Sequence, residues 1–200
     1  MKISEETRSI LKNFATINSG IKVGAGNQLQ TISNMKNILA TANVPETFGQ
    51  EFSIYNLVEF LGAVSLLDNP DFNFNDSSLS ISDTDTSMTY FYASEGMVTS
   101  PDKMITMPDA EIKIDLSSTL LNELQKAASV LGVNDLILES DGTNIKLVVT
   151  DKKNTTSNTF SRIVGEGNGV SFTMNFKIEN LKILDGNYEV FVSSKGISNF

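Results

Sequence analysis

The chain has 200 residues, of which 40% are hydrophobic and 20% charged, and this composition is typical of a globular protein. It contains no cysteine, histidine or tryptophan, which excludes disulfides, thiolate or histidine-bound metal sites and Ser-His-Asp catalysis. The net charge of −9 argues against a general nucleic-acid-binding protein, because such proteins are usually basic.

The acidic residues are unevenly distributed along the chain. Ten acidic residues and no basic one lie between Lys36 and Lys103, and we interpret this stretch as a solvated acidic surface. No apolar run approaches the ~20 residues that a membrane-spanning helix needs. The acidic start, MKISEE, is unlike a signal peptide, so we expect a soluble, cytosolic protein without a membrane partner.

Residues 4–17 are predicted to form the first helix. Ser4 can cap it, and the two glutamates of its first turn suit the positive end of the helix dipole. An apolar stripe follows at helical spacing, formed by Ile3, Ile10, Leu11, Phe14 and Ile17. Arg8 and Lys12 lie off this stripe, one turn apart.

Short strands are predicted between residues 21 and 52, followed by an apolar helix at 53–67 and three more short strands. The segment GAGNQL fails the dinucleotide-binding fingerprint because Leu29 occupies the third glycine position. Asp83 and Asp85 begin a pattern similar to a calcium loop. The glycine and the terminal glutamate of that loop are absent, so the segment is interpreted as a polar turn.

Residues 95–111 contain two prolines and no clear period, and they are predicted to form a connector. A strand at 112–116 and an amphipathic helix at 117–131 follow, with Gly132 as the stop signal. Four more strands are then expected, the first two joined by a hairpin turn at Asp141-Gly142.

The two halves of the sequence match each other. The pattern FxIxNL occurs at residues 52–57 and again at 176–181, each time where a strand is expected to lead into a second helix. We therefore predict an α+β fold of two similar domains, 1–94 and 112–200, each with a β-sheet backed by two helices on one face. By the logic of the repeat, the second domain is shorter by roughly twenty residues, or about two strands.

The segment LKNFATINSGI, at residues 11–21, resembles the opening helix and turn of the sliding clamps of T-even-like bacteriophages. The resemblance continues through YNLVEFLGAVSLL, MVTSPDKMITMP and LKILDGNYEVFVSSKG. It implies the DNA clamp fold and a homotrimeric ring that encircles duplex DNA without reading its sequence. It further implies that the ring tethers the phage DNA polymerase as a processivity factor.

The same resemblance implies further partners and a location. A clamp loader would place the ring on DNA, late-transcription factors would use it as a mobile activator, and it would act in the cytoplasm of the infected bacterial host. No catalytic activity, cofactor or metal is implied. This agrees with the missing histidine and cysteine, because a topological tether needs neither a nucleophile nor a base.

The resemblance assigns residues to two surfaces. The DNA-facing candidates carry positive charge that could meet phosphates weakly and in a salt-dependent way. They are Arg8, Lys12, Lys126, Lys182, Lys177 and Lys2. A pocket near the connector is the expected site for a hydrophobic partner peptide, with Met104, Ile105, Met107 and Pro108 as its candidates.

Two alternatives remain open at the level of the sequence. A β-rich phage structural or assembly protein would also tolerate the loss of histidine and cysteine. An enzyme that uses carboxylates and a divalent metal would have Asp83 and Asp85 as its least unsuitable ligands. The repeat and the first motif favour the clamp over both.

Overall fold

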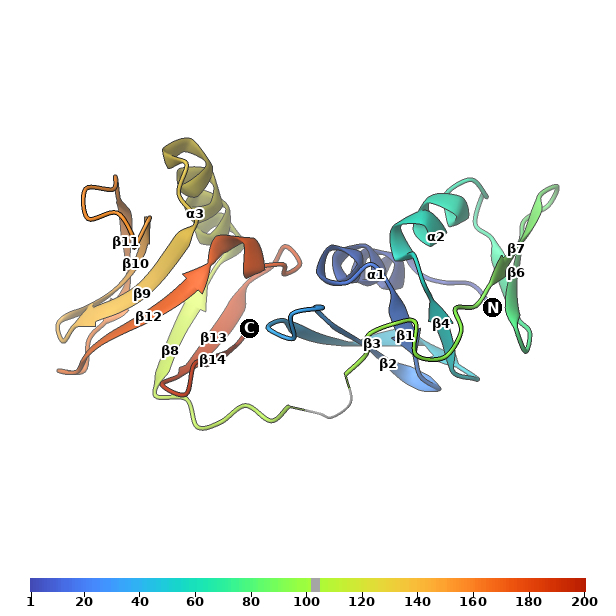
Figure 1. The fold of residues 1–200 in the computed structure, drawn as a ribbon, viewed down its shortest axis with the longest axis horizontal. Coiled ribbons are helices and arrows are strands. Elements are labelled where there is room, and N and C mark those ends of the chain that lie inside the picture. Colours follow the sequence, from blue (N-terminus) through green and yellow to red (C-terminus); the bar gives the residue numbers. More distant parts are fainter. Residues whose placement is uncertain (102–104) are drawn as a thin grey trace. The chain divides into compact units, whose positions relative to one another are not determined.

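The computed structural model describes residues 1–101 and 105–200 (Figure 1). The chain divides into two compact units, unit 1 (Met1–Met104) and unit 2 (Ile105–Phe200). Each unit has its own cluster of buried hydrophobic side chains. No helix among the described residues is long and apolar enough to cross a membrane.

In its described residues, 1–101, unit 1 contains two helices and seven strands. In chain order they are α1 (Glu5–Ile17), β1 (Ile21–Val23), β2 (Gly26–Ile32), β3 (Leu39–Phe48), β4 (Phe52–Ile54), α2 (Leu57–Val64), β5 (Asp71–Phe74), β6 (Ser78–Ser82) and β7 (Ser87–Phe91). The strands pair as β2-β3, β1-β4 and β5-β6-β7, all antiparallel. The N-terminal Met1 extends the last sheet, because its carbonyl accepts the Phe72 N–H at 2.7 Å.

The helices of unit 1 begin where the sequence offers caps. The Ser4 side chain accepts the Thr7 N–H, and the Asn56 side chain accepts the Glu59 N–H. The predicted stripe of α1 is buried, with Phe14 only 3% exposed. Both helices lie on one side of the β1 to β4 strands (Figure 1).

Unit 2 contains one α-helix, one 3₁₀ turn and seven strands in its described residues. They are β8 (Ile112–Leu116), α3 (Ser118–Leu131), β9 (Asp135–Asp141), β10 (Asn144–Thr150), β11 (Phe160–Glu166), β12 (Ser171–Lys177), η1 (Ile178–Asn180), β13 (Tyr188–Ser193) and β14 (Ile197–Asn199). The sheet orders are β11-β10-β9-β12 and β14-β13-β8. Gly132 ends α3 in the left-handed conformation, with φ of +66°.

The internal repeat is visible in the connections between elements. The first FxIxNL segment runs from β4 into α2, and the second runs from β12 into η1. In unit 2, β13 lies between β8 and β14. In unit 1, β5 has the matching place between the Met1 backbone and β6. Within the described residues of unit 2, no strand corresponds to β7.

One expectation for unit 2 is corrected by the structure. A second helix was expected after Phe176, but only the single 3₁₀ turn η1 forms there. Six residues separate Leu181 from β13, and three of them, Asp185 to Asn187, favour turns. In unit 1 the same position is followed by a long apolar stretch, which forms α2 and packs against α1.

Candidate nucleic-acid interface

The exposed faces of α1 and α3 each carry one lysine. Lys12 is exposed on α1, and Lys126 is exposed on α3. When the buried stripes of the two helices are aligned, Lys126 takes the position of Thr16, one turn from Lys12. In the part of the chain that the structure describes, neither ammonium group has a carboxylate within 4 Å, so both remain available to an anionic ligand.

Arg8 and Lys2 come together at the start of α1. They line an open hollow of about 570 Å³ with Glu46 and Asn69 among its other residues. The Arg8 guanidinium lies 3.2 Å from the Glu5 carboxylate, and its side chain is only 22% exposed. The Lys2 ammonium donates to the Asn69 carbonyl at 2.6 Å. Both cations are therefore partly engaged by the protein itself.

Lys177 projects away from the helix layer of unit 2. Its neighbour Phe176 pairs with the buried Leu136 and packs against the core, so the next residue along β12 faces the opposite side of the sheet. There the Lys177 ammonium lies 2.6 Å from the Asp135 carboxylate, whose side chain is only 3% exposed. This ion pair raises the pKa of Lys177.

Lys182 and three of the connector candidates lie outside the helices and strands. Lys182 follows η1 and is half-buried. Ile105 is 56% exposed, and Met107 and Pro108 are half-buried in an irregular segment before β8. Met104 lies outside the described residues.

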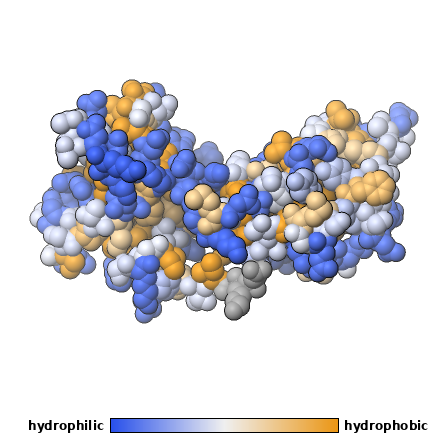
Figure 2. All heavy atoms as spheres, in the orientation of Figure 1, coloured by the Kyte–Doolittle hydropathy of each residue, from blue (hydrophilic) through white to orange (hydrophobic). Residues whose placement is uncertain are grey.

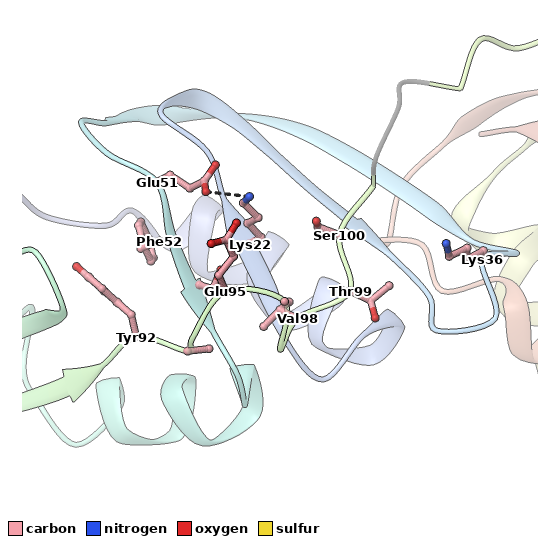
Figure 3. Close-up of a pocket in the computed structure, with 12 residues that line it drawn as sticks. Lys22, Lys36, Glu51, Phe52, Tyr92, Glu95, Val98, Thr99 and Ser100 are labelled. Atoms are coloured by element: carbon pink, nitrogen blue, oxygen red, sulfur yellow. Dashed lines mark ion pairs between the residues drawn. The ribbon is translucent and has the colours of Figure 1, made fainter.

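A groove on unit 1 was not predicted from the sequence. Its volume is about 590 Å³, and it lies between strands β1 and β4 on one side and residues 93–100 on the other (Figure 3). The Lys22 ammonium and the Glu51 carboxylate face each other across 2.8 Å. Their hydrogen bond raises the pKa of Lys22. The floor includes Phe52 and Tyr92, and burial raises the pKa of the Tyr92 phenol.

Of the two acidic residues considered as metal ligands, Asp83 has a structural role. The Asp83 carboxylate accepts backbone N–H groups from Asp68, Asp85 and Thr86, which closes the turn between β6 and β7. These hydrogen bonds lower the pKa of Asp83. Among the described residues, no three acidic side chains come together as a metal site would require.

Comparison with known proteins identifies the family. The sliding clamp of Vibrio phage KVP40 is 35% identical over 207 residues, an alignment that covers 100% of this chain and 94% of the relative. The sliding clamp of Enterobacteria phage T4 is 30% identical, with 98% of this chain and 89% of the relative covered. The chain belongs to the sliding-clamp family. The resemblance proposed from LKNFATINSGI is thereby confirmed, although no family model matches this sliding clamp.

Solved structures confirm the clamp fold. The proliferating cellular nuclear antigen of Entamoeba histolytica has a TM-score of 0.63 at 15% identity, with 93% of this chain and 84% of that chain covered. The beta clamp of Helicobacter pylori bound to a DNA ligase peptide has a TM-score of 0.59 at 16% identity, with coverages of 96% and 62%. This sliding clamp therefore has the α+β clamp architecture that its sequence predicted.

Proposed function

We propose that this sliding clamp encircles duplex DNA as a homotrimeric ring and tethers the phage DNA polymerase to its template. The proposal is carried by Lys12 and Lys126, one exposed lysine on each of two equivalent helices, which lie one turn apart when the helices are aligned. Two isolated lysines, rather than a dense basic track, suit a protein that must slide, because phosphate contacts are sequence-independent and weakened by salt. In this role the clamp has no catalytic activity.

Ring formation requires surfaces at which one copy meets the next. Among the described strands, β7 is paired only with β6 and β11 only with β10. Each of these open edges displays a large apolar side chain, with Phe91 72% exposed and Ile163 61% exposed. Open apolar edges are templates for pairing with another chain. We place the contact between neighbouring copies at these two strands.

Other large apolar side chains on the surface lie outside the sheets. On the face shown in Figure 2, hydrophobic residues form separate spots among hydrophilic ones. Exposed examples outside the sheets are Met35 at a hairpin tip and Val58 on α2. Neither lies on a strand with free backbone groups, so neither can extend a sheet.

Partner proteins are expected near the connector. One similar solved structure is the Archaeoglobus fulgidus PCNA bound to the C-terminal region of FEN-1, and the Helicobacter pylori clamp holds a DNA ligase peptide. We infer that this chain also receives partner segments, at the groove of unit 1 and beside Ile105, Met107 and Pro108. The clamp loader and the late-transcription factors are proposed as further partners, in the cytoplasm of the infected host.

The test of this function is topological. The protein is loaded onto nicked circular DNA by its clamp loader, and half of the sample is then cut once with a restriction enzyme. We expect the clamp to remain on the circle and to leave the linear molecule through its free ends. Equal retention on both forms would mean ordinary binding and would overturn the ring.

A further inference from the structure

Residues 93–100, which we call the strap, lie against unit 1 after β7 ends. The Ala93 N–H donates to the Ser53 carbonyl on β4 at 2.8 Å. Near the other end of the strap, the Thr99 carbonyl accepts a hydrogen bond from the Asn18 side chain at 3.0 Å. A segment with the composition of a linker is therefore bonded to the folded unit at both ends.

Asn18 is placed to hold the strap. It is 5% exposed and forms the C-cap of α1 in an extended conformation. Its side-chain amide nitrogen donates to the Ile32 carbonyl at 2.9 Å as well as to Thr99, and its side-chain oxygen accepts the Gly20 N–H at 3.1 Å. One buried side chain thus joins the end of α1, the end of β2 and the strap.

Packing beside Asn18 supports the same contact. A Cβ added at Gly20 would lie 3.2 Å from a methyl carbon of Val98 and 2.9 Å from the Ile54 carbonyl oxygen. The glycine therefore allows the strap to approach the loop between α1 and β1 closely. The strap is held by a side-chain hydrogen bond and a backbone hydrogen bond, and the absence of a Cβ at Gly20 leaves room for Val98.

The groove of unit 1 depends on the strap. Six of its twelve lining residues belong to the strap, and Figure 3 shows the Glu95 side chain extending towards Lys22 and Glu51. If the strap left unit 1, half of the lining would leave with it. Whatever fixes the strap therefore also fixes the shape of the groove.

We propose that Asn18 is a positioning residue that latches the strap onto unit 1 and so shapes the groove for an extended segment of a partner protein. This inference rests on the proposed function only for the identity of the occupant. The latch itself is a property of the free protein. The C-cap of α1 is made by the Asn18 backbone N–H, which donates to the Phe14 carbonyl, whereas the side chain serves β2, the Gly20 N–H and the strap.

Hydrogen exchange of the full-length protein tests the latch. In Asn18→Ala, we expect amides in residues 93–100 to exchange about tenfold faster or more, while the cores of β1 and β2 remain protected. The matched control is Asn56→Ala, which removes the cap of α2 without touching the strap. Unchanged strap exchange in Asn18→Ala would overturn the proposal, as would equal acceleration in both variants.

A second variant covers the case in which Asn18→Ala fails to fold. Val98→Ser keeps the hydrogen bond from Asn18 to the Thr99 carbonyl and removes the apolar side chain beside Gly20. If the latch holds the strap, we expect residues 93–100 to stay largely protected in this variant. Complete loss of that protection would show that Val98, and not Asn18, holds the strap, and the proposal would fail.

Primer extension on a circular template tests the consequence for partners. With Asn18→Ala, we expect shorter products from the phage polymerase, while retention of the clamp on circular DNA stays at the wild-type level. Wild-type product length with Asn18→Ala would overturn the role of the latch in partner binding. If the wild-type clamp itself fails to lengthen products, the proposed function fails instead, and the exchange experiment still decides the latch.

Discussion

The Lys177 ammonium lies 2.6 Å from the Asp135 carboxylate on the sheet face of unit 2 that α3 does not cover. The second carboxylate oxygen accepts the Lys152 N–H at 3.0 Å. Asp135 therefore joins the beginning of β9 to the end of β12 and to the loop after β10. A lysine that the sequence suggested for DNA is held here in a structural ion pair.

Replacement of this carboxylate is expected to destabilise unit 2. Asp135→Asn keeps the size of the side chain but removes the charge that Lys177 and the Lys152 N–H face. We expect the free energy of unfolding to fall by about 1–3 kcal/mol. Urea denaturation measures this free energy. The control is Asp185→Asn, which removes one negative charge at an exposed position.

The loss of stability in Asp135→Asn should depend on pH. Burial raises the pKa of Asp135, but the Lys177 ammonium and the hydrogen bond from the Lys152 N–H outweigh it, and the pKa lies below its ordinary value of 3.8. The folded state thus binds the proton less tightly than the unfolded state, so the stabilisation is present above about pH 4 and is lost as the pH falls through the folded-state pKa. The difference in the free energy of unfolding between wild type and Asp135→Asn should therefore become smaller below pH 4. A difference that stays constant with pH would contradict a stabilising ion pair between Asp135 and Lys177.

Charge reversal on the exposed face of α1 should affect DNA and not folding. Lys12→Glu places a negative charge where we expect phosphates, so the lifetime of the loaded clamp on circular DNA should fall, most clearly at low salt. Stability should change by less than about 0.5 kcal/mol because the position is exposed. The control is Lys195→Glu in the turn between β13 and β14. Equal lifetimes for the two variants would contradict a DNA-facing α1.

Two glycines of unit 1 should respond differently to the same substitution. In Gly20→Ala, the added methyl group meets the Ile54 and Tyr55 carbonyl oxygens at 2.9 and 3.0 Å, whereas at Gly24 nothing lies within 4 Å. We expect Gly20→Ala to lower the free energy of unfolding by about 1–3 kcal/mol. Thermal unfolding compares the variants, and similar melting temperatures would show that the α1–β1 loop is less tightly packed than described.

A charge on an open sheet edge should oppose ring formation. Ile163→Lys on β11 replaces an exposed apolar side chain with a charged group that discourages strand pairing. We expect trimers to dissociate at concentrations where the wild type remains assembled, as measured by light scattering. Met35→Lys changes an equally apolar, 84% exposed residue at a hairpin tip and should leave the trimer intact. If Ile163→Lys also leaves it intact, the interface lies elsewhere.

Local patterns in the sequence determined most of the secondary structure. The cap at Ser4 and its apolar stripe define α1, Gly132 ends α3, and Asp141-Gly142 forms the predicted turn. These features depend on residues a few positions apart, and their periodicity can be read from one chain. The repeat and the LKNFATINSGI motif also sufficed to indicate the clamp fold and its family.

Only the tertiary structure decided which charged groups are available and where the connector lies. The face that Lys177 occupies follows from strand register, in which a slip of one residue would reverse every side chain. The latch joins Asn18 to Thr99, which are 81 residues apart. A contact between residues so far apart in sequence depends on how the whole unit folds, and the helix or strand propensities of neighbouring residues do not predict it. In unit 2 the FxIxNL pattern was also present, but only six residues separate Leu181 from β13, and no α-helix forms there.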